Sequence, residues 1–167
     1  TKEGRILEHH LGDVVLFNVY FPNGQQSEER LVHKMKFYRD FLDHCERLRA
    51  EGKGIIICGD VNTAHREIDL THPKANEDTS GFLPSERAWI DALLDKGYID
   101  TFRHIHGDKT QCYSWWSYRA GARARNVGWR IDYFFISKEL EDKLQDAFIL
   151  AHIEGSDHCP VGIEIAL

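Results

Sequence analysis

Residues 14–60 most constrain the fold, because they alternate two short apolar runs with one long amphipathic stretch. Residues 14–20 are β-branched and aromatic and end at a Pro-Asn-Gly turn, which is typical of a buried strand. Glu28–Ala50 repeats apolar residues every three or four positions, which predicts a helix. Gly54–Asp60 is a continuous apolar strand of the kind buried on both faces of a sheet. This strand–helix–strand order predicts an α/β layered fold.

The remaining sequence completes a single domain without repeats or linkers. The polar, irregular residues 63–81 are too long for a plain connection and predict a functional loop. We expect a helix at 84–96, a polar turn holding His104 and His106, a strand at 129–136, a short helix at 137–144 capped by Ser137, and strands at 147–153 and 161–167.

Composition excludes several classes of protein. The four cysteines form no CxxC pair, so free thiols in a reducing compartment are expected, with Cys58 as a small core residue. No apolar run approaches the roughly 20 residues that span a bilayer, so no membrane partner is predicted. The net charge of −6 disfavours a simple nucleic-acid binder, yet residues 117–131 hold four arginines, Arg130 among them, and no acid.

Polar side chains gather where the predicted strands end. They are Tyr20 and Asn23, Asp60 and Asn62, Asp132, and Ser156-Asp157-His158. Strand ends carry the reacting side chains in layered α/β proteins, so one convergent site is favoured over separate accidents. A serine hydrolase is rejected because Ser156 has no nucleophile-elbow context, and no glycine-rich phosphate loop is present.

Each of these pieces also has an ordinary explanation. Taken alone, Gly-Asp-x-Asn at 59–62 is more often a turn former, since Asp and Asn side chains bond nearby backbone amides. Asp132 is harder to explain in that way, because its neighbours are apolar and a carboxylate there is costly unless partnered. His158 is a natural partner, which predicts an oriented His–carboxylate pair.

Four segments in this order resemble one known family. They are Val19-Tyr20-Phe21-Pro22-Asn23, Gly59-Asp60-Val61-Asn62, Asn126-Val127-Gly128-Trp129-Arg130-Ile131-Asp132-Tyr133 and Gly155-Ser156-Asp157-His158-Cys159-Pro160. Together they resemble the second half of the exonuclease III and apurinic endonuclease branch of the endonuclease/exonuclease/phosphatase superfamily. The resemblance implies a DNase I-like fold, with residues 1–167 as the C-terminal half of a four-layered α/β sandwich: a mixed β-sheet packed against helices.

The resemblance also implies a separate catalytic role for each of these residues. Asp60 would handle the proton of the attacking water, and Asn62 would orient that water. His158, held by Asp132, would contact the scissile phosphate. Asp157 would bind Mg²⁺ or Mn²⁺, and Asp60, Asn62 and His158 would contribute to a second metal position, since hard oxygen ligands suit such cations.

Substrate contacts are implied as well. Tyr20 and Asn23 would bind phosphate oxygens or support the neighbouring carboxylates. Four side chains match DNA-contacting positions of the family: Trp115, Trp129 and Ile131 at the pocket for a flipped abasic sugar, and Asn76 at the DNA backbone. A plain core role explains Trp115 about equally well, and Trp129, beside Arg130 in the basic loop, somewhat less well. Arg119, Arg123 and Arg125 could touch phosphates, and a solvated basic loop explains them equally well.

The implied function is a DNA-repair hydrolase that cleaves double-stranded DNA at abasic sites, an endonuclease of base excision repair with 3′–5′ exonuclease or 3′-phosphodiesterase capacity. Two alternatives remain open: another phosphodiesterase of the superfamily (a general DNase or a phosphoinositide phosphatase), or an inactive half-domain that only binds DNA or a partner. The family's N-terminal half supplies an asparagine and a metal-binding glutamate. In the family fold each half also supplies one sheet, so we expect this chain alone to expose the inner face of its sheet, and either to need that half or to self-associate. Such an enzyme would be cytoplasmic in a bacterium or archaeon, associated with the nucleoid, and nuclear in a eukaryote.

Overall fold

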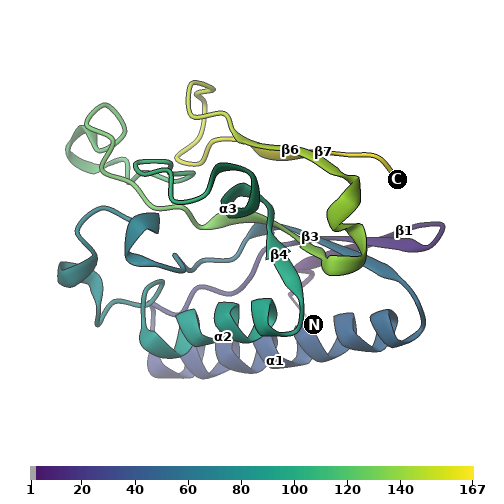
Figure 1. Ribbon diagram of the computed structural model, residues 1–167. Helices are drawn as coiled ribbons and strands as arrows, with labels where there is room; N and C mark the ends of the chain where they lie inside the picture. The colour runs from purple at the N-terminus through teal and green to yellow at the C-terminus, as the bar shows by residue number, and fades with distance from the viewer. Residues whose placement is uncertain (1–2) are drawn as a thin grey trace.

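The predicted strand–helix–strand unit is present in the computed structural model, which describes residues 3–167 (Figure 1). Strand β2 (Val14–Val19) is joined by helix α1 (Glu28–Ala50) to the parallel strand β3 (Gly54–Asp60). Helix α1 begins after Ser27, whose hydroxyl accepts a hydrogen bond from the Arg30 backbone amide at 3.2 Å. Such a cap satisfies one of the free amides of the first turn.

A five-stranded mixed sheet forms around this unit, in the order β1-β2-β3-β5-β4. Strand β1 (Ile6–Leu11) runs antiparallel to β2, β5 (Asp132–Ser137) antiparallel to β3, and β4 (Tyr98–Asp100) antiparallel to β5. The register between β3 and β5 places Asp60 directly opposite Asp132. The sheet thus brings together two acids that are far apart in the sequence.

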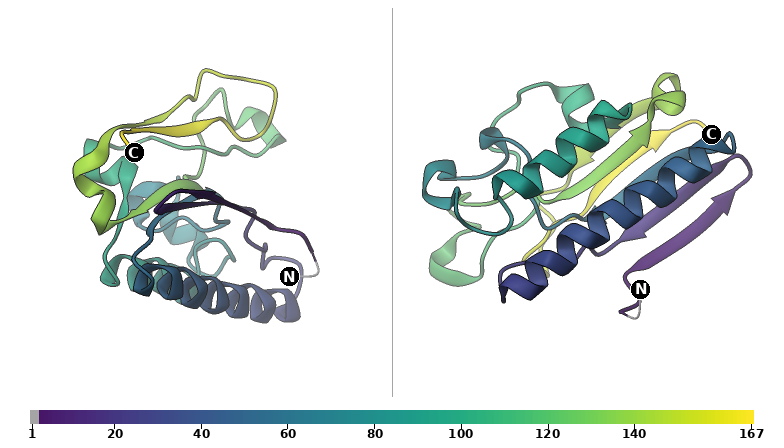
Figure 2. Two further views of the ribbon diagram at one scale, coloured as in Figure 1. Left: turned by 90° about the vertical axis from the view of Figure 1, so that its right-hand side faces the viewer. Right: turned by 90° about the horizontal axis from the view of Figure 1, so that it is seen from below.

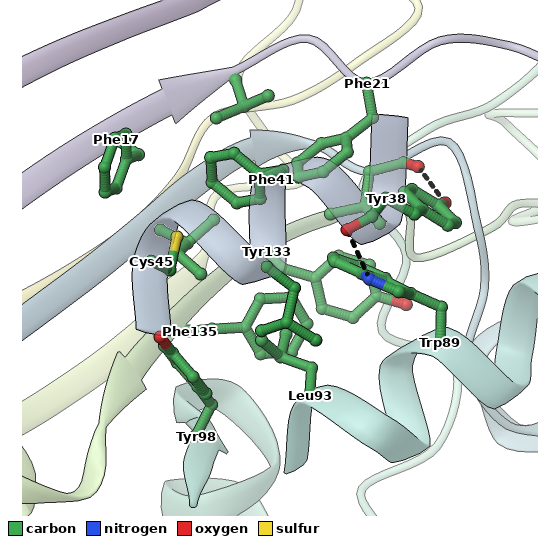
Figure 3. Packing of buried hydrophobic residues seen from close by; sticks show 14 of the residues in the cluster. Phe17, Phe21, Tyr38, Phe41, Cys45, Trp89, Leu93, Tyr98, Tyr133 and Phe135 are labelled. Atoms are coloured by element: carbon green, nitrogen blue, oxygen red, sulfur yellow. Dashed lines mark hydrogen bonds between the residues drawn. The ribbon is translucent and has the colours of Figure 1, made fainter. Parts of the chain in front are cut away.

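Helices α1 and α2 (Pro84–Asp95) cover one face of the sheet (Figures 1 and 2). The main core lies between these two helices and the sheet, and it is rich in aromatic rings (Figure 3). The indole of Trp89 stacks on Tyr38 with ring centres 4.1 Å apart, and its Nε1 donates to the Tyr38 carbonyl oxygen at 2.9 Å. Burying side chains of this size contributes about 1.5–3 kcal/mol each, so this layer holds the fold together.

The opposite face of the sheet is only partly covered. Strand β6 (Leu144–Ile149) pairs with β7 (Val161–Ile165) as a separate two-stranded sheet, which packs near β5 and the 3₁₀ helix that precedes it (Figure 2). Towards β1 the face is open: Leu7 is 72% exposed and Leu11 is 42% exposed. Cys58 is half-buried, so its prediction as a core residue is wrong, because β3 turns it towards the partly covered face of the sheet, away from α1 and α2.

Several predicted elements differ from the observed ones. Strand β5 begins at Asp132 rather than at residue 129, because the backbone of Trp129 bonds to Trp115 instead of to the sheet. Residues Lys138–Lys143 form a 3₁₀ helix, and Ser137 does not cap it with its side chain. The Ser137 hydroxyl instead accepts from the Ile55 backbone amide at 2.9 Å.

Other differences lie in short elements. Strand β6 begins three residues before the predicted 147, and β7 ends at Ile165. His104 and His106 lie in helix α3 (Thr101–His106) rather than in a turn, and β1 and β4 were not predicted. Residues 63–81 are irregular as predicted, with 3₁₀ turns at Glu67–Asp69 and Pro73–Asn76. Within residues 3–167, no helix has the length and apolar character needed to cross a membrane.

Candidate active site

An open pocket of about 560 Å³ lies beyond the end of β3, where four loops meet. Every site residue predicted from sequence lines it except Asp132, which lies directly behind His158. The predicted residues that line it are Tyr20, Asn23, Asp60, Asn62, Asn76, Trp115, Trp129, Ile131, Asp157 and His158. The structure therefore brings the strand-end side chains into one site.

Asp60 lies at the floor of this pocket. Gly59 precedes it with φ 120°, and a Cβ atom at that position would lie 2.2 Å from the Val19 carbonyl oxygen. Only glycine fits this close backbone approach. Burial, followed by the negative charge of Asp132, raises the pKa of Asp60 to about 7.

Asn62 closes a turn onto Asp60, as the Gly-Asp-x-Asn pattern indicated. Its backbone amide donates to Asp60 Oδ1 at 2.8 Å, and its Nδ2 donates to Asp60 Oδ2 at 3.0 Å. Asn62 adopts φ 56°, a left-handed conformation that few residues other than glycine and asparagine tolerate. Its Oδ1 accepts from Asn23 Nδ2 at 3.2 Å. The motif therefore forms a turn, as its composition indicated, and this turn lies at the pocket.

His158 and Asp132 are in contact as predicted, with Nδ1 and Oδ2 separated by 2.8 Å. Ser114, which sequence reasoning missed, donates to the same Asp132 oxygen at 2.7 Å and accepts from the Asp132 backbone amide at 3.0 Å. Burial lowers the pKa of His158, but the hydrogen bond and charge of Asp132 outweigh burial, so the pKa is raised. Asp132 thus orients the imidazole and favours its charged form.

An aromatic wall faces these groups. Trp115 and Trp129 are half-buried, pair through their backbones, and pack against a cluster that contains Phe82 and Ile131. They therefore line the pocket and also pack against the interior. Trp115 Nε1 donates to Asp157 Oδ2 at 3.0 Å. Burial raises the pKa of Asp157, but this hydrogen bond and the local polar groups outweigh burial, so the pKa is lowered.

The basic segment divides into arginines with different partners. Arg119 and Arg125 line the pocket, near Asn76, whose Nδ2 donates to the His72 carbonyl oxygen at 2.9 Å. Arg123 instead donates to three backbone carbonyls of residues 151–156. Only Arg119 and Arg125 of this segment therefore face the pocket.

Arg130 does not belong to the basic loop, so that part of the prediction is wrong. It is 1% exposed, and it donates to Asp69 Oδ1 at 2.8 Å and to both oxygens of Asp100, at 3.0 and 2.7 Å. Arg103 also donates to Asp69. Burial raises the pKa of Asp69, but the charge of Arg130 outweighs burial and brings the pKa to about 2. The guanidinium is therefore a structural anchor for residues 129–131.

The predicted metal ligands offer part of a cation site. Carboxylate and amide oxygens of Asp60, Asn62 and Asp157 are the hard donors that Mg²⁺ and Mn²⁺ prefer. Within residues 3–167, however, no three His, Cys, Asp or Glu side chains come close enough to hold a metal ion. These residues fit a divalent cation of this class only if water or further protein groups complete its coordination.

The fold and the pocket define a mixed α/β protein with an acid–histidine site at one end of its sheet. The chain belongs to the endonuclease/exonuclease/phosphatase family, which residues 3–158 match. The fold resembles solved DNase I-like nucleases. Proteins of this family depend on a metal ion for cleavage.

Three relatives show where in the family the chain lies. The exodeoxyribonuclease of Bacillus subtilis (strain 168) is 45% identical over 98% of this chain and 65% of its own length. The DNA-(apurinic or apyrimidinic site) endonuclease of Dictyostelium discoideum is 42% identical over 99% of the chain and 46% of its own length. The DNA repair nuclease APEX1 of Danio rerio is 40% identical over 99% of this chain and 53% of its own length. The chain spans 65% or less of these relatives.

Two solved structures have the same fold. The 3′ phosphatase NExo from Neisseria, bound to a product DNA hairpin, has a TM-score of 0.90 at 25% identity and covers 98% of this chain and 65% of its own. The catalytic domain of APE2 from Xenopus laevis has a TM-score of 0.83 at 32% identity and covers 96% and 52%.

Proposed function

We propose that this chain is the catalytic half of a DNA-repair phosphodiesterase that incises double-stranded DNA at abasic sites, with 3′–5′ exonuclease or 3′-phosphodiesterase capacity. The observation that carries the proposal is the oriented His158–Asp132 pair beside the acid Asp60, in a pocket with an aromatic wall. The relatives named above, which act as apurinic endonucleases or exodeoxyribonucleases, support it.

Asp60 is suited to accept the proton of an attacking water, because a pKa of about 7 leaves a substantial basic fraction at neutral pH. Asn62 holds both Asp60 oxygens and so fixes the direction from which the water is activated. His158, which Asp132 orients and favours in its charged form, would donate to a phosphate oxygen as negative charge develops. Asp157 would hold a bound Mg²⁺ or Mn²⁺ with additional ligands, and this cation would neutralise phosphate charge. Asp60, Asn62 and His158 would contribute to a second metal position, His158 only in its neutral form.

Substrate selection rests on the pocket wall. Trp115, Trp129 and Ile131 present apolar surface that a flipped sugar without a base can occupy, and an abasic nucleotide has no base to unstack. Asn76 and the exposed Arg119 and Arg125 lie where backbone phosphates would pass. Tyr20 and Asn23 line the same pocket and would meet phosphate oxygens.

The open inner face of the sheet supports a partner segment. Leu7 and Leu11 leave apolar surface in water, and a complementary N-terminal half would bury it and add metal ligands. In the absence of that half, the alternative of a chain that binds DNA without cleaving it is favoured, because the described acids do not form a metal cluster. The working location would be the DNA-containing compartment: the bacterial or archaeal cytoplasm, or the nucleus.

Magnesium-dependent cleavage of a duplex with one abasic site tests the proposal. The chain is assayed alone and with an N-terminal half added in trans, beside its Asp60→Asn and His158→Asn variants, and an intact duplex is the control. Cleavage at the abasic site that both substitutions abolish supports the assignment. Cleavage of the intact duplex at the same rate, or full activity in both variants, would overturn it. Replacing Mg²⁺ by Mn²⁺ in the same assay ranks the two cations by the rate of cleavage that each supports.

A further inference from the structure

A buried ion pair lies beneath the pocket and takes no part in the roles described above. Lys34 of α1 and Glu86 of α2 have side chains that are 0% exposed, and Lys34 Nζ lies 2.7 Å from Glu86 Oε1. Removing two charges from water costs several kcal/mol per ion unless further hydrogen bonds compensate. The partners that provide this compensation therefore indicate what the pair holds in place.

The ammonium of Lys34 donates its other two hydrogen bonds to the turn that carries Asn62. Nζ donates to the Asn62 carbonyl oxygen at 2.7 Å and to Thr63 Oγ1 at 3.0 Å. Thr63 Oγ1 lies 2.9 Å from the Tyr38 hydroxyl, itself fully buried. Asn62 adopts a left-handed conformation that asparagine tolerates, and several hydrogen bonds act as constraints that fix the turn around it. Lys34 supplies one of those constraints.

The carboxylate of Glu86 holds the opposite wall. It accepts from Ser80 Oγ at 2.7 Å, from the Gly81 backbone amide at 2.5 Å and from the Leu83 backbone amide at 3.1 Å. Ser80 and Gly81 both line the pocket. Gly81 also lies against the ring of Trp129, since a Cβ atom there would be 3.3 Å from Trp129 Cζ3.

We infer that Lys34 and Glu86 are positioning residues for the site. One buried ion pair fixes the turn that aims Asn62 at Asp60 and the Ser80–Gly81 wall that supports Trp129. The inference rests on the proposed function for its catalytic consequence, but the geometry it describes does not depend on which substrate binds. Neither residue touches the pocket space, so both act through others.

Four variants separate positioning from stability. Lys34→Met removes the cation at similar volume and leaves Glu86 buried and unpaired. Lys34→Met combined with Glu86→Gln leaves no buried charge, so it should regain most of the lost thermal stability. Glu86→Gln alone keeps one side-chain oxygen that can accept hydrogen bonds from Ser80 or Gly81, but it leaves the ammonium of Lys34 without its carboxylate partner. Leu93→Ala, a fully buried core change on α2, is the control for stability loss away from the pocket.

The kinetic readout is steady-state cleavage of abasic duplex well below each melting temperature, in whichever form cleaves, the chain alone or with its N-terminal half. We expect Lys34→Met and the double variant to lower kcat about tenfold with little change in KM, as loss of an aligned catalytic group does. Leu93→Ala should retain kcat. A double variant that regains stability together with full kcat would overturn the inference.

A structural readout tests the inference even if no form cleaves DNA. Absence of cleavage would refute the proposed function, and the positioning inference would then be decided by this readout. Amide hydrogen exchange is followed in peptides covering residues 60–66 and 79–83. Faster exchange in both segments of the double variant, with exchange elsewhere at the wild-type rate, supports positioning of the two walls. Exchange at the wild-type rate in these segments would overturn it, whatever the activity.

Discussion

Asp60→Asn is expected to make the isolated chain more stable, and to abolish cleavage in whichever form of the protein cleaves DNA. The carboxyl of Asp60 is half-buried and faces Asp132 across the β3–β5 ladder. Its pKa rises from 3.8 to about 7 on folding, so the folded state holds a proton that the unfolded state has released. Asparagine has the shape of the protonated acid and carries no charge to desolvate.

The pH dependence follows from the direction of that shift. Because the folded-state pKa is raised, the contribution of Asp60 to stability is fully present below about pH 4 and is lost as the pH rises through about 7. Three pH units correspond to about 4 kcal/mol, which is an upper bound. Solvent screening of a half-buried group reduces the expected gain of the Asn variant to about 2–3 kcal/mol at pH 8.

Urea unfolding followed by tryptophan fluorescence measures this gain at pH 4, 5, 6, 7 and 8, in the presence of EDTA. The difference between variant and wild type should be small at pH 4 and grow by about 1 kcal/mol per pH unit up to pH 7. Asp43→Asn, an exposed acid on α1, is the control for loss of a carboxylate without burial. A pH-independent difference for Asp60→Asn, or a less stable variant at pH 8, would refute the reasoning.

Three further changes test other parts of the site. Arg130→Met should cost about 3–5 kcal/mol of unfolding free energy because it leaves buried carboxylates unpaired. The control Arg125→Met should change the unfolding free energy by no more than about 0.5 kcal/mol. Equal urea midpoints for the two variants would contradict this prediction. Gly59→Ala places Cβ 2.2 Å from a backbone oxygen at φ 120°, so it should lose about 3 kcal/mol or more by thermal unfolding; an unchanged Tm would argue against that contact. Asp132→Asn should lower the pKa of His158, because it removes the carboxylate charge that raises it, and NMR titration of the imidazole reports this; an unmoved titration would show that other groups set that pKa.

The central part of the fold could be predicted because its signals are local. Helix α1 spans the predicted residues, since its apolar face repeats over 23 residues and a serine cap precedes it. Strand β3 is an unbroken apolar run. The site could be located for a related reason: Asp60 and Asn62 immediately follow that strand, and a partially buried Asp132 needs a partner that His158 provides.

The missed features depend on tertiary contacts. Strand β1 is largely exposed along its length, so no alternation marks it, and β4 has only three residues. Arg130 was assigned to the basic loop because arginines precede it in the sequence, yet its partners Asp69 and Asp100 lie 61 and 30 residues away. Lys34 sits on the apolar face of α1, a local conflict that could have indicated a buried partner.

The buried charges at this end of the molecule fall into two groups with opposite consequences. Lys34 and Arg130 are matched by acids and by backbone groups, so they hold the walls of the pocket and resist its collapse. Asp60 and Asp132 are like charges directly opposite each other on antiparallel strands, an arrangement that destabilises the fold. His158 relieves part of that repulsion, and a divalent cation at the proposed site would relieve more. A site of this kind binds protons and cations because its fixed walls prevent the two acids from moving apart.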